Sequence, residues 1–173
     1  MVVADFQNAG HLPALAAASK VVPVALVEEV FSELTIASPD AKQRQRDRAR
    51  QAQTELAAGD FEVFEIHPGT REQEMFSLLR GARTSQHDRG EAASIAMASA
   101  HADLLFVTGD KNGTLSALNE LSGTGERVMR VPVFVKVLFT AGALSVSDAR
   151  AVAPFAASHG ITPIWWDDWL RSL

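Results

Sequence analysis

Four acidic residues from distant parts of the chain stand at positions where side chains could assemble into a metal site. Asp5 follows the apolar run VVA, Glu29 lies beside a broad apolar stripe, Glu91 opens an alanine-rich segment, and Asp110 follows DLLFVT. If these acids met, each pair about 4 Å apart would repel by roughly 4 kcal/mol at an effective dielectric constant near 20. Such a cluster requires protonated acids or a bound cation. Carboxylates without cysteine or histidine partners favour Mg²⁺ or Mn²⁺ over zinc.

Each acid also has a common structural explanation. Asp88 and Glu91 fit the N-cap and third position of a helix, where capping is the commoner role. Asp110 beside Gly109 fits a turn, and Glu29 fits a solvated helix face. The hypothesis of a metal site therefore rests on the combination of the acids and their order, and not on any single member.

The elements that would position these acids alternate between strands and helices. We expect strands at 1–5, 61–66, 103–108 and about 128–131, and helices at about 12–18, 23–34, 38–58, 70–79, 90–101 and 113–121, followed by helices broken at Gly142 and Gly160. This alternation predicts one domain, 1–173, folded as an α/β/α sandwich with a mostly parallel sheet of four or five strands. Ligands of such sheets bind outside the carboxyl ends of the strands.

Composition limits the classes of function. The chain has 173 residues, 47% apolar, with no cysteine and a net charge of −5. A disulfide framework and a thiolate metal site are excluded. With no basic-then-apolar leader and no long uncharged span, we expect a cytoplasmic protein with no membrane contact. Because the chain is acidic, any contact with nucleic acid must be local.

The segment GEAASIAMASAHADLLFVTGD resembles the second half of a PIN domain, a metal-dependent nuclease fold. That family runs from an acid through a small-residue helix and an apolar strand to Thr-x-Asp, here Glu91 to Thr108-Gly109-Asp110. The segment VVPVALVEEVFSEL is similar to the family's second helix, and Asp5 resembles its first acid. The resemblance implies catalytic roles for Asp5, Glu29, Glu91 and Asp110. It also implies metal ligands among Asp5, Glu91, Asp110 and the further candidate Asp88, with Thr108 supporting a ligand or the substrate.

The resemblance also implies a function, a Mg²⁺- or Mn²⁺-dependent endoribonuclease that hydrolyses RNA phosphodiesters. Many such proteins are toxins of toxin–antitoxin pairs, so RNA, an antitoxin protein and a second copy are the expected partners. The sequence DFQNAG departs from the family's first motif, in which Thr or Ser follows the acid. A catalytically degenerate PIN-like binding or regulatory module is therefore the alternative. A phospho-acceptor domain would need an acidic pair after the first strand, and the lone Asp5 argues against it.

Two further groups of residues have two interpretations each. Lys42, Arg46 and Arg50 share one face of a predicted helix, which is either solvated or a contact for RNA or a partner. The tryptophans cluster near the C-terminus, where they either hold the last helix on the core or form a patch for a partner; they are Trp165, Trp166 and Trp169.

Overall fold

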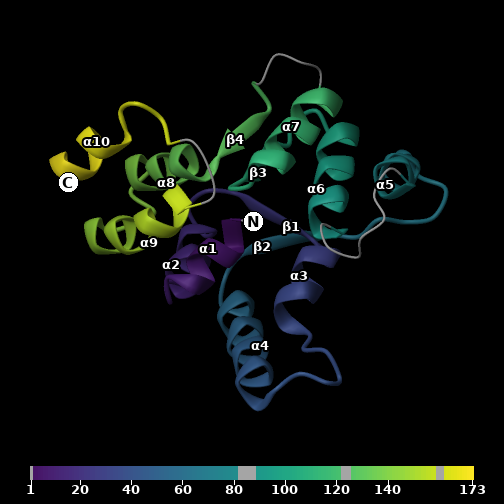
Figure 1. The fold of residues 1–173 in the computed structure, drawn as a ribbon, viewed down its shortest axis with the longest axis horizontal. Coiled ribbons are helices and arrows are strands. Elements are labelled where there is room, and N and C mark those ends of the chain that lie inside the picture. Colours follow the sequence, from purple (N-terminus) through teal and green to yellow (C-terminus); the bar gives the residue numbers. More distant parts are fainter. Residues whose placement is uncertain (1, 82–88, 122–125, 159–161) are drawn as a thin grey trace.

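The fold is mostly helical. The computed structural model describes residues 2–81, 89–121, 126–158 and 162–173 (Figure 1). Of these residues, 63% are in helices and 9% in strands. The strands form two separate two-stranded sheets. The predicted α/β/α sandwich with a parallel sheet of four or five strands is therefore wrong.

Each small sheet is parallel. Strand β1 (Val24–Val27) pairs with β2 (Phe61–Phe64), and β3 (Phe106–Thr108) pairs with β4 (Val128–Arg130). Helices α3 (Glu28–Thr35) and α4 (Gln43–Ala57) connect the first pair, and α7 (Lys111–Glu120) connects the second. The alternation of strands and helices thus gives two local parallel pairs, but three- and four-residue strands do not extend into one sheet.

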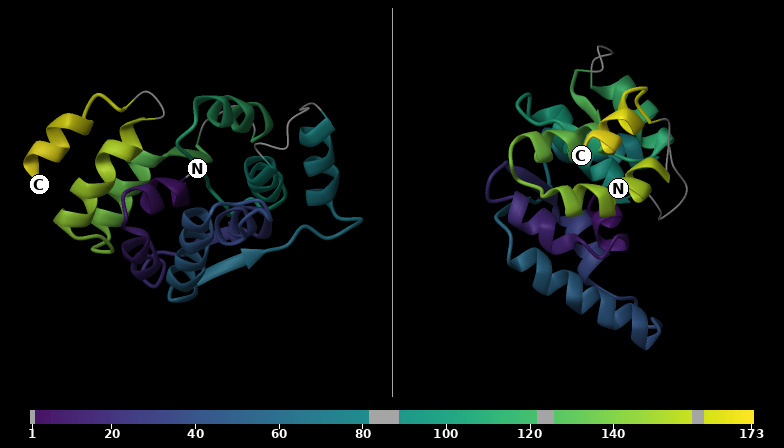
Figure 2. Two further views of the ribbon diagram at one scale, coloured as in Figure 1. Left: turned by 60° about the horizontal axis from the view of Figure 1, so that its bottom comes forward. Right: turned by 90° about the vertical axis from the view of Figure 1, so that its left-hand side faces the viewer.

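The remaining helices surround these strands. In Figure 1, α1, α2, α8 and α9 lie on one side of the strands and α6 and α7 on the other, while α5 and α10 lie near opposite ends of the molecule. Helix α4 projects away from the rest in both Figure 1 and the right-hand view of Figure 2. The bounds are α1 (Val2–Asn8), α2 (Leu12–Ala18), α5 (Arg71–Gly81), α6 (Arg89–Ala100), α8 (Val131–Thr140), α9 (Val146–Ser158) and α10 (Trp166–Ser172).

Two predicted elements near the N-terminus are wrong. The segment expected as a strand at 1–5 belongs to helix α1, in which Val3 and Phe6 are three residues apart and both buried. The segment expected as a helix from Pro23 begins instead as β1, and its helix starts only at Glu28. Val24–Val27 is a short apolar run with two β-branched residues, and pairing with β2 decides its structure.

Helix α6 is buried on most sides because its side chains are small. Ala92, Ala93 and Ala96 are fully buried. At its first turn, a Cβ atom on Gly90 would lie 2.8 Å from Val30 Cγ2 of α3, so only glycine allows this approach. The alanine-rich segment that the sequence marks as a helix therefore lies against the core, and its N-terminus is held close to α3.

The tryptophans hold α10 on α8. Trp166 is almost fully buried, and Trp169 contacts the edge of the Phe139 ring at a centroid distance of 5.7 Å. The Lys136 ammonium lies 4.1 Å from the centre of the Trp165 ring. This packing corresponds to the first of the two interpretations of the tryptophan cluster.

Candidate functional site

The carboxyl ends of β1 and β3 carry the acidic residues. Helix α3 begins at Glu28 directly after β1, and Asp110 lies two residues beyond the last residue of β3. Helix α6 supplies Glu91 from its first turn and packs against α3, α7 and β3. Three helix N-termini therefore lie in this region, each of which favours nearby negative charge.

Asp110 is the N-cap of α7. Its Oδ2 atom accepts a hydrogen bond of 2.7 Å from the Gly113 N–H, and its own N–H donates to Thr108 Oγ1 at 3.1 Å. Thr108 is 2% exposed, so its hydroxyl fixes the turn between β3 and α7 from inside. The sequence suggested a turn role for Asp110 beside Gly109, and the structure shows that Asp110 caps the helix that follows this turn.

The Glu91 carboxylate reaches the same turn. A Cβ atom on Gly113 would overlap Glu91 Oε2, would lie 2.7 Å from Glu91 Cδ and would lie 3.0 Å from Thr108 Oγ1. The Gly113 N–H is the group that Asp110 binds. Two carboxylates thus adjoin one glycine: Asp110 binds its N–H, and the absence of a side chain leaves room for Glu91. Gly113 was not among the predicted site residues, although a glycine three residues after Asp110 inside a helix was a usable signal.

Glu29 lies near the start of α6. Its Oε1 atom is 3.8 Å from Arg89 Nη2, and its Oε2 atom is buried without a hydrogen-bond partner. Its neighbour Glu33 accepts a hydrogen bond of 3.0 Å from the Gly90 N–H and so caps α6 from outside the helix. Sequence analysis did not single out Glu33 or Arg89. A buried carboxylate oxygen without a donor is costly unless a proton or a cation compensates.

Asp5 comes from a different element than expected. It lies in the middle of α1, which packs against α2 and α9, and it is 1% exposed. Asp88 lies outside the described residues. Within the described ranges, no group of three or more Asp, Glu, His or Cys side chains is placed to hold a metal ion. The structure therefore brings together Glu91, Asp110 and Thr108, with Glu29 beside the first residue of α6.

Basic residues accompany the acids. Arg130 pairs with Thr108 in the β3–β4 register and donates from Nη2 to the Gly109 carbonyl at 3.1 Å, while its Nε atom is buried without a hydrogen-bond partner. Sequence analysis missed it. The three residues of the predicted basic stripe, Lys42, Arg46 and Arg50, are exposed; Lys42 is the N-cap of α4 and the two arginines lie within it. Arg46 donates to the Pro39 carbonyl.

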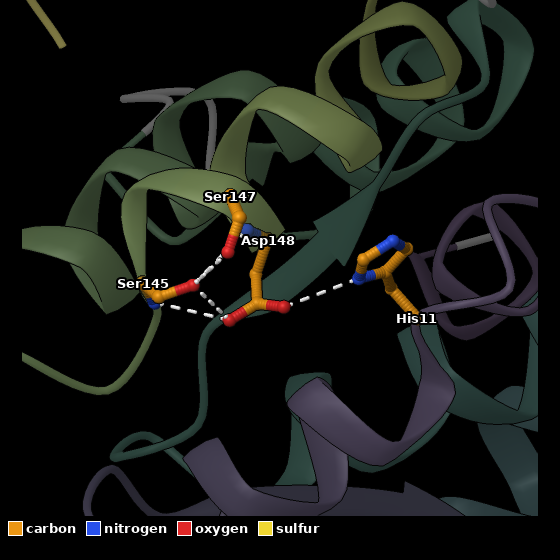
Figure 3. A network of polar contacts seen from close by, with 4 residues as sticks. All are labelled: His11, Ser145, Ser147 and Asp148. Atoms are coloured by element: carbon orange, nitrogen blue, oxygen red, sulfur yellow. Dashed lines mark hydrogen bonds and ion pairs between the residues drawn. The ribbon is translucent and has the colours of Figure 1, made fainter.

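A second polar network, which joins α9 to the loop before α2, is structural (Figure 3). Asp148 Oδ2 accepts from the Ser145 N–H and hydroxyl at 3.2 and 2.5 Å, and Oδ1 lies 3.1 Å from His11 Nδ1. Burial raises the pKa of Asp148, but the hydrogen bonds from Ser145 and the contact with His11 outweigh it and lower the pKa below its usual value. Because the carboxylate separates the serine from the histidine, His11 cannot activate that hydroxyl as in a Ser-His-Asp triad.

Comparison with protein-family models, with curated proteins and with solved structures finds no match to this chain in any of the three. In the part of the chain that the structure describes, no helix is both long and apolar enough to cross a membrane.

Proposed function

We propose that the protein is a divalent-metal-dependent ribonuclease whose site is built around Glu91 and Asp110. The observation that carries this proposal is the approach of both carboxylates to Gly113 at the end of β3. Two like charges placed side by side repel, and a helix cap needs only one of them. A cation between them would turn that repulsion into binding.

The donor set fits a hard cation. Glu91 and Asp110 offer carboxylate oxygens, and the Thr108 hydroxyl orients their turn. Glu29, whose Oε2 atom is buried without a hydrogen-bond donor, lies near the start of α6 and does not form a group of three acids with them among the described residues. A bound Mg²⁺ or Mn²⁺ would supply Lewis acidity and a nucleophilic water at neutral pH. The segment from Glu91 to Asp110 also keeps the order of residues that resembles a PIN-type site, which supports phosphodiester hydrolysis.

Cationic side chains support an anionic substrate. Arg130 lies at the end of β4 beside Gly109, where its guanidinium could bind a phosphate near the two acids. The exposed stripe of Lys42, Arg46 and Arg50 on α4 offers a second, local contact for the RNA backbone on an otherwise acidic chain. If the ribonuclease is a toxin, an antitoxin protein could inhibit it by covering these basic residues.

The proposal is tested by cleavage of a mixed RNA pool with Mn²⁺ and with a chelator. Glu91→Gln keeps the side chain's size and removes its charge, so we expect activity to fall by more than the roughly 10–100-fold that follows loss of an outer-shell partner. Glu74→Gln, an exposed acid of α5, is the matched control and should cleave like the wild type. Melting curves of all three should agree. Cleavage that survives Glu91→Gln contradicts the proposal.

A second candidate function is a non-catalytic binding module. It is favoured by the position of Asp5 within α1 and by the lack of a three-acid group in the described residues. Under this function, the wild type would neither bind Mn²⁺ nor cleave RNA, but it would still bind RNA through α4. Charge reversal of Lys42, Arg46 and Arg50 would then abolish the salt dependence of binding.

A further inference from the structure

An apolar groove with a volume of about 900 Å³ lies between the two small sheets. Strand β1 and the segment before it line one part of the groove, and β3 and the segment before it line another. Helices α6 and α8 contribute Met97 and Phe134. The groove is distinct from the turn that holds Glu91 and Asp110, because neither acid lines it.

Strands β1 and β3, which both line the groove, each have an edge without a strand partner in the described structure. In the described structure β1 pairs only with β2, and β3 only with β4. A strand with one neighbour leaves a row of N–H and C=O groups on its other edge, which is a template for another extended chain. All four described strands have one such unpaired edge, and residues of β1 and β3 line the same groove.

Exposed apolar side chains follow the same groove. Val21, Leu105 and Val137 are 58%, 52% and 40% exposed, and all three line it. Apolar side chains exposed around one groove indicate an interaction site more strongly than singly scattered ones do. The binding partner is therefore expected to present apolar side chains.

The charged side chains at the groove indicate which charge the partner segment should carry at its leading end. Asp60 directly precedes β2, Asp103 lies shortly before β3, and Glu62 lies within β2. Among the described residues that line the groove, Lys20 is the only cation. A strand that enters parallel to β1 and β3 would place its leading residues near Asp60 and Asp103, where basic side chains are favoured.

We propose that this groove binds an extended apolar segment of a partner protein, led by Lys or Arg, which adds as a strand between β1 and β3. Backbone hydrogen bonds to the two edges provide affinity, apolar contacts with Leu105 and Val137 provide packing, and the acidic end fixes direction. Since β1 has four residues and β3 has three, a segment of about four to six residues matches their length.

The test uses the full chain and the fluorescent peptide acetyl-Lys-Lys-Thr-Val-Val-Val-Ser, followed by fluorescence anisotropy. Leu105→Ser removes apolar surface from the groove, whereas Leu115→Ser removes a leucine of equal exposure, 52%, from α7 away from it. We expect saturable binding, weakened about tenfold or more by Leu105→Ser and unchanged by Leu115→Ser. Methylation of alternate peptide nitrogens should abolish binding, because it removes backbone donors without changing side chains. Hydrogen exchange at β1 and β3 should slow on binding.

Three results would overturn the proposal. The first is no saturable binding of the peptide, and the second is equal binding of the N-methylated peptide, which would indicate apolar adsorption without strand pairing. The third is concentration-dependent dimerisation of the wild type that Leu105→Ser removes and the peptide does not compete with, since a second copy would then occupy the groove. Replacing both lysines of the peptide by glutamate is a separate test of the direction in which the peptide binds. Binding that does not weaken would contradict the role of Asp60 and Asp103.

Discussion

Asp110 and Asp148 both stabilise the start of a helix, but their surroundings differ. Asp148 receives hydrogen bonds from Ser145 and lies against His11, so its charge meets donors and a potential cation. Asp110 receives one hydrogen bond from Gly113 and adjoins the carboxylate of Glu91 across that glycine. The position of a carboxylate whose neighbours are hydrogen-bond donors is explained by its contribution to stability. A second carboxylate beside the same glycine is not required for a helix cap, and a bound cation is the function that we propose for the pair.

Among substitutions that leave both acids in place, Gly113→Ala has the largest expected effect, because it alters the surroundings of Asp110. The added Cβ would overlap the Glu91 carboxylate and crowd Thr108, so Glu91 must move away from Asp110. Alanine also improves helix propensity by about 1 kcal/mol, which offsets the local crowding. We expect Mn²⁺ affinity and RNA cleavage to fall about tenfold or more, while the free energy of unfolding changes by less than about 1 kcal/mol.

Gly81→Ala is the matched control for this substitution. A Cβ atom there meets no other heavy atom within 4 Å, and the residue is also at a helical position. It should leave metal binding and cleavage unchanged. If Gly113→Ala behaves like Gly81→Ala in both assays, the position of Glu91 is irrelevant to function.

A smaller effect is expected on the free energy of unfolding, in which variants of Asp148 and Asp110 should differ. Asp148→Ala removes the acceptor for Ser145 and the contact with His11, so unfolding by denaturant should show a loss of about 1 kcal/mol. Asp110→Asn should cost only a few tenths of a kcal/mol, because asparagine is an equally good N-cap. RNA cleavage should show the opposite order, with Asp148→Ala unaffected. If Asp148→Ala loses RNA cleavage while it remains folded, the proposed difference between Asp148, which stabilises, and Asp110, which functions, is wrong.

The loss of stability at acid pH also tests the structural role of Asp148. The folded-state pKa of Asp148 is lowered, so its charge contributes stability above its unfolded pKa, about 3.9, and that contribution is lost as the pH falls through the lowered value. The difference in unfolding free energy between the wild type and Asp148→Asn should therefore be full at pH 6 and shrink below about pH 4. A difference that stays constant down to pH 2 would show that the charge of Asp148 does not contribute.

The sequence predicts local elements well and distant pairings badly. Helix α6 was expected at 90–101 and lies at Arg89–Ala100, and α2 agrees with its predicted range. Both are recognisable from neighbouring residues. In contrast, Val24–Val27 becomes a strand only by pairing with Phe61–Phe64, more than thirty residues away, and short apolar runs do not distinguish strand from helix.

The same limit applies to the candidate site. Glu91, Thr108 and Asp110 were identifiable because they lie in one continuous motif. The contact of Glu91 with Gly113 depends on how α6 packs against α7, and the position of Arg130 depends on the β3–β4 register. No local pattern encodes either arrangement. Asp5 was misplaced for the related reason that a five-residue apolar segment was assigned without its packing partners.

The most direct test of the central claim, that Asp110 serves a cation as well as a helix, is titration calorimetry with Mn²⁺. Wild type, Asp110→Asn and Asp148→Asn should be compared at pH 7, at a temperature at which melting curves show all three to be folded. The account predicts that the wild type and Asp148→Asn bind Mn²⁺ alike, and that Asp110→Asn binds at least about tenfold more weakly. Equal binding by wild type and Asp110→Asn would contradict it.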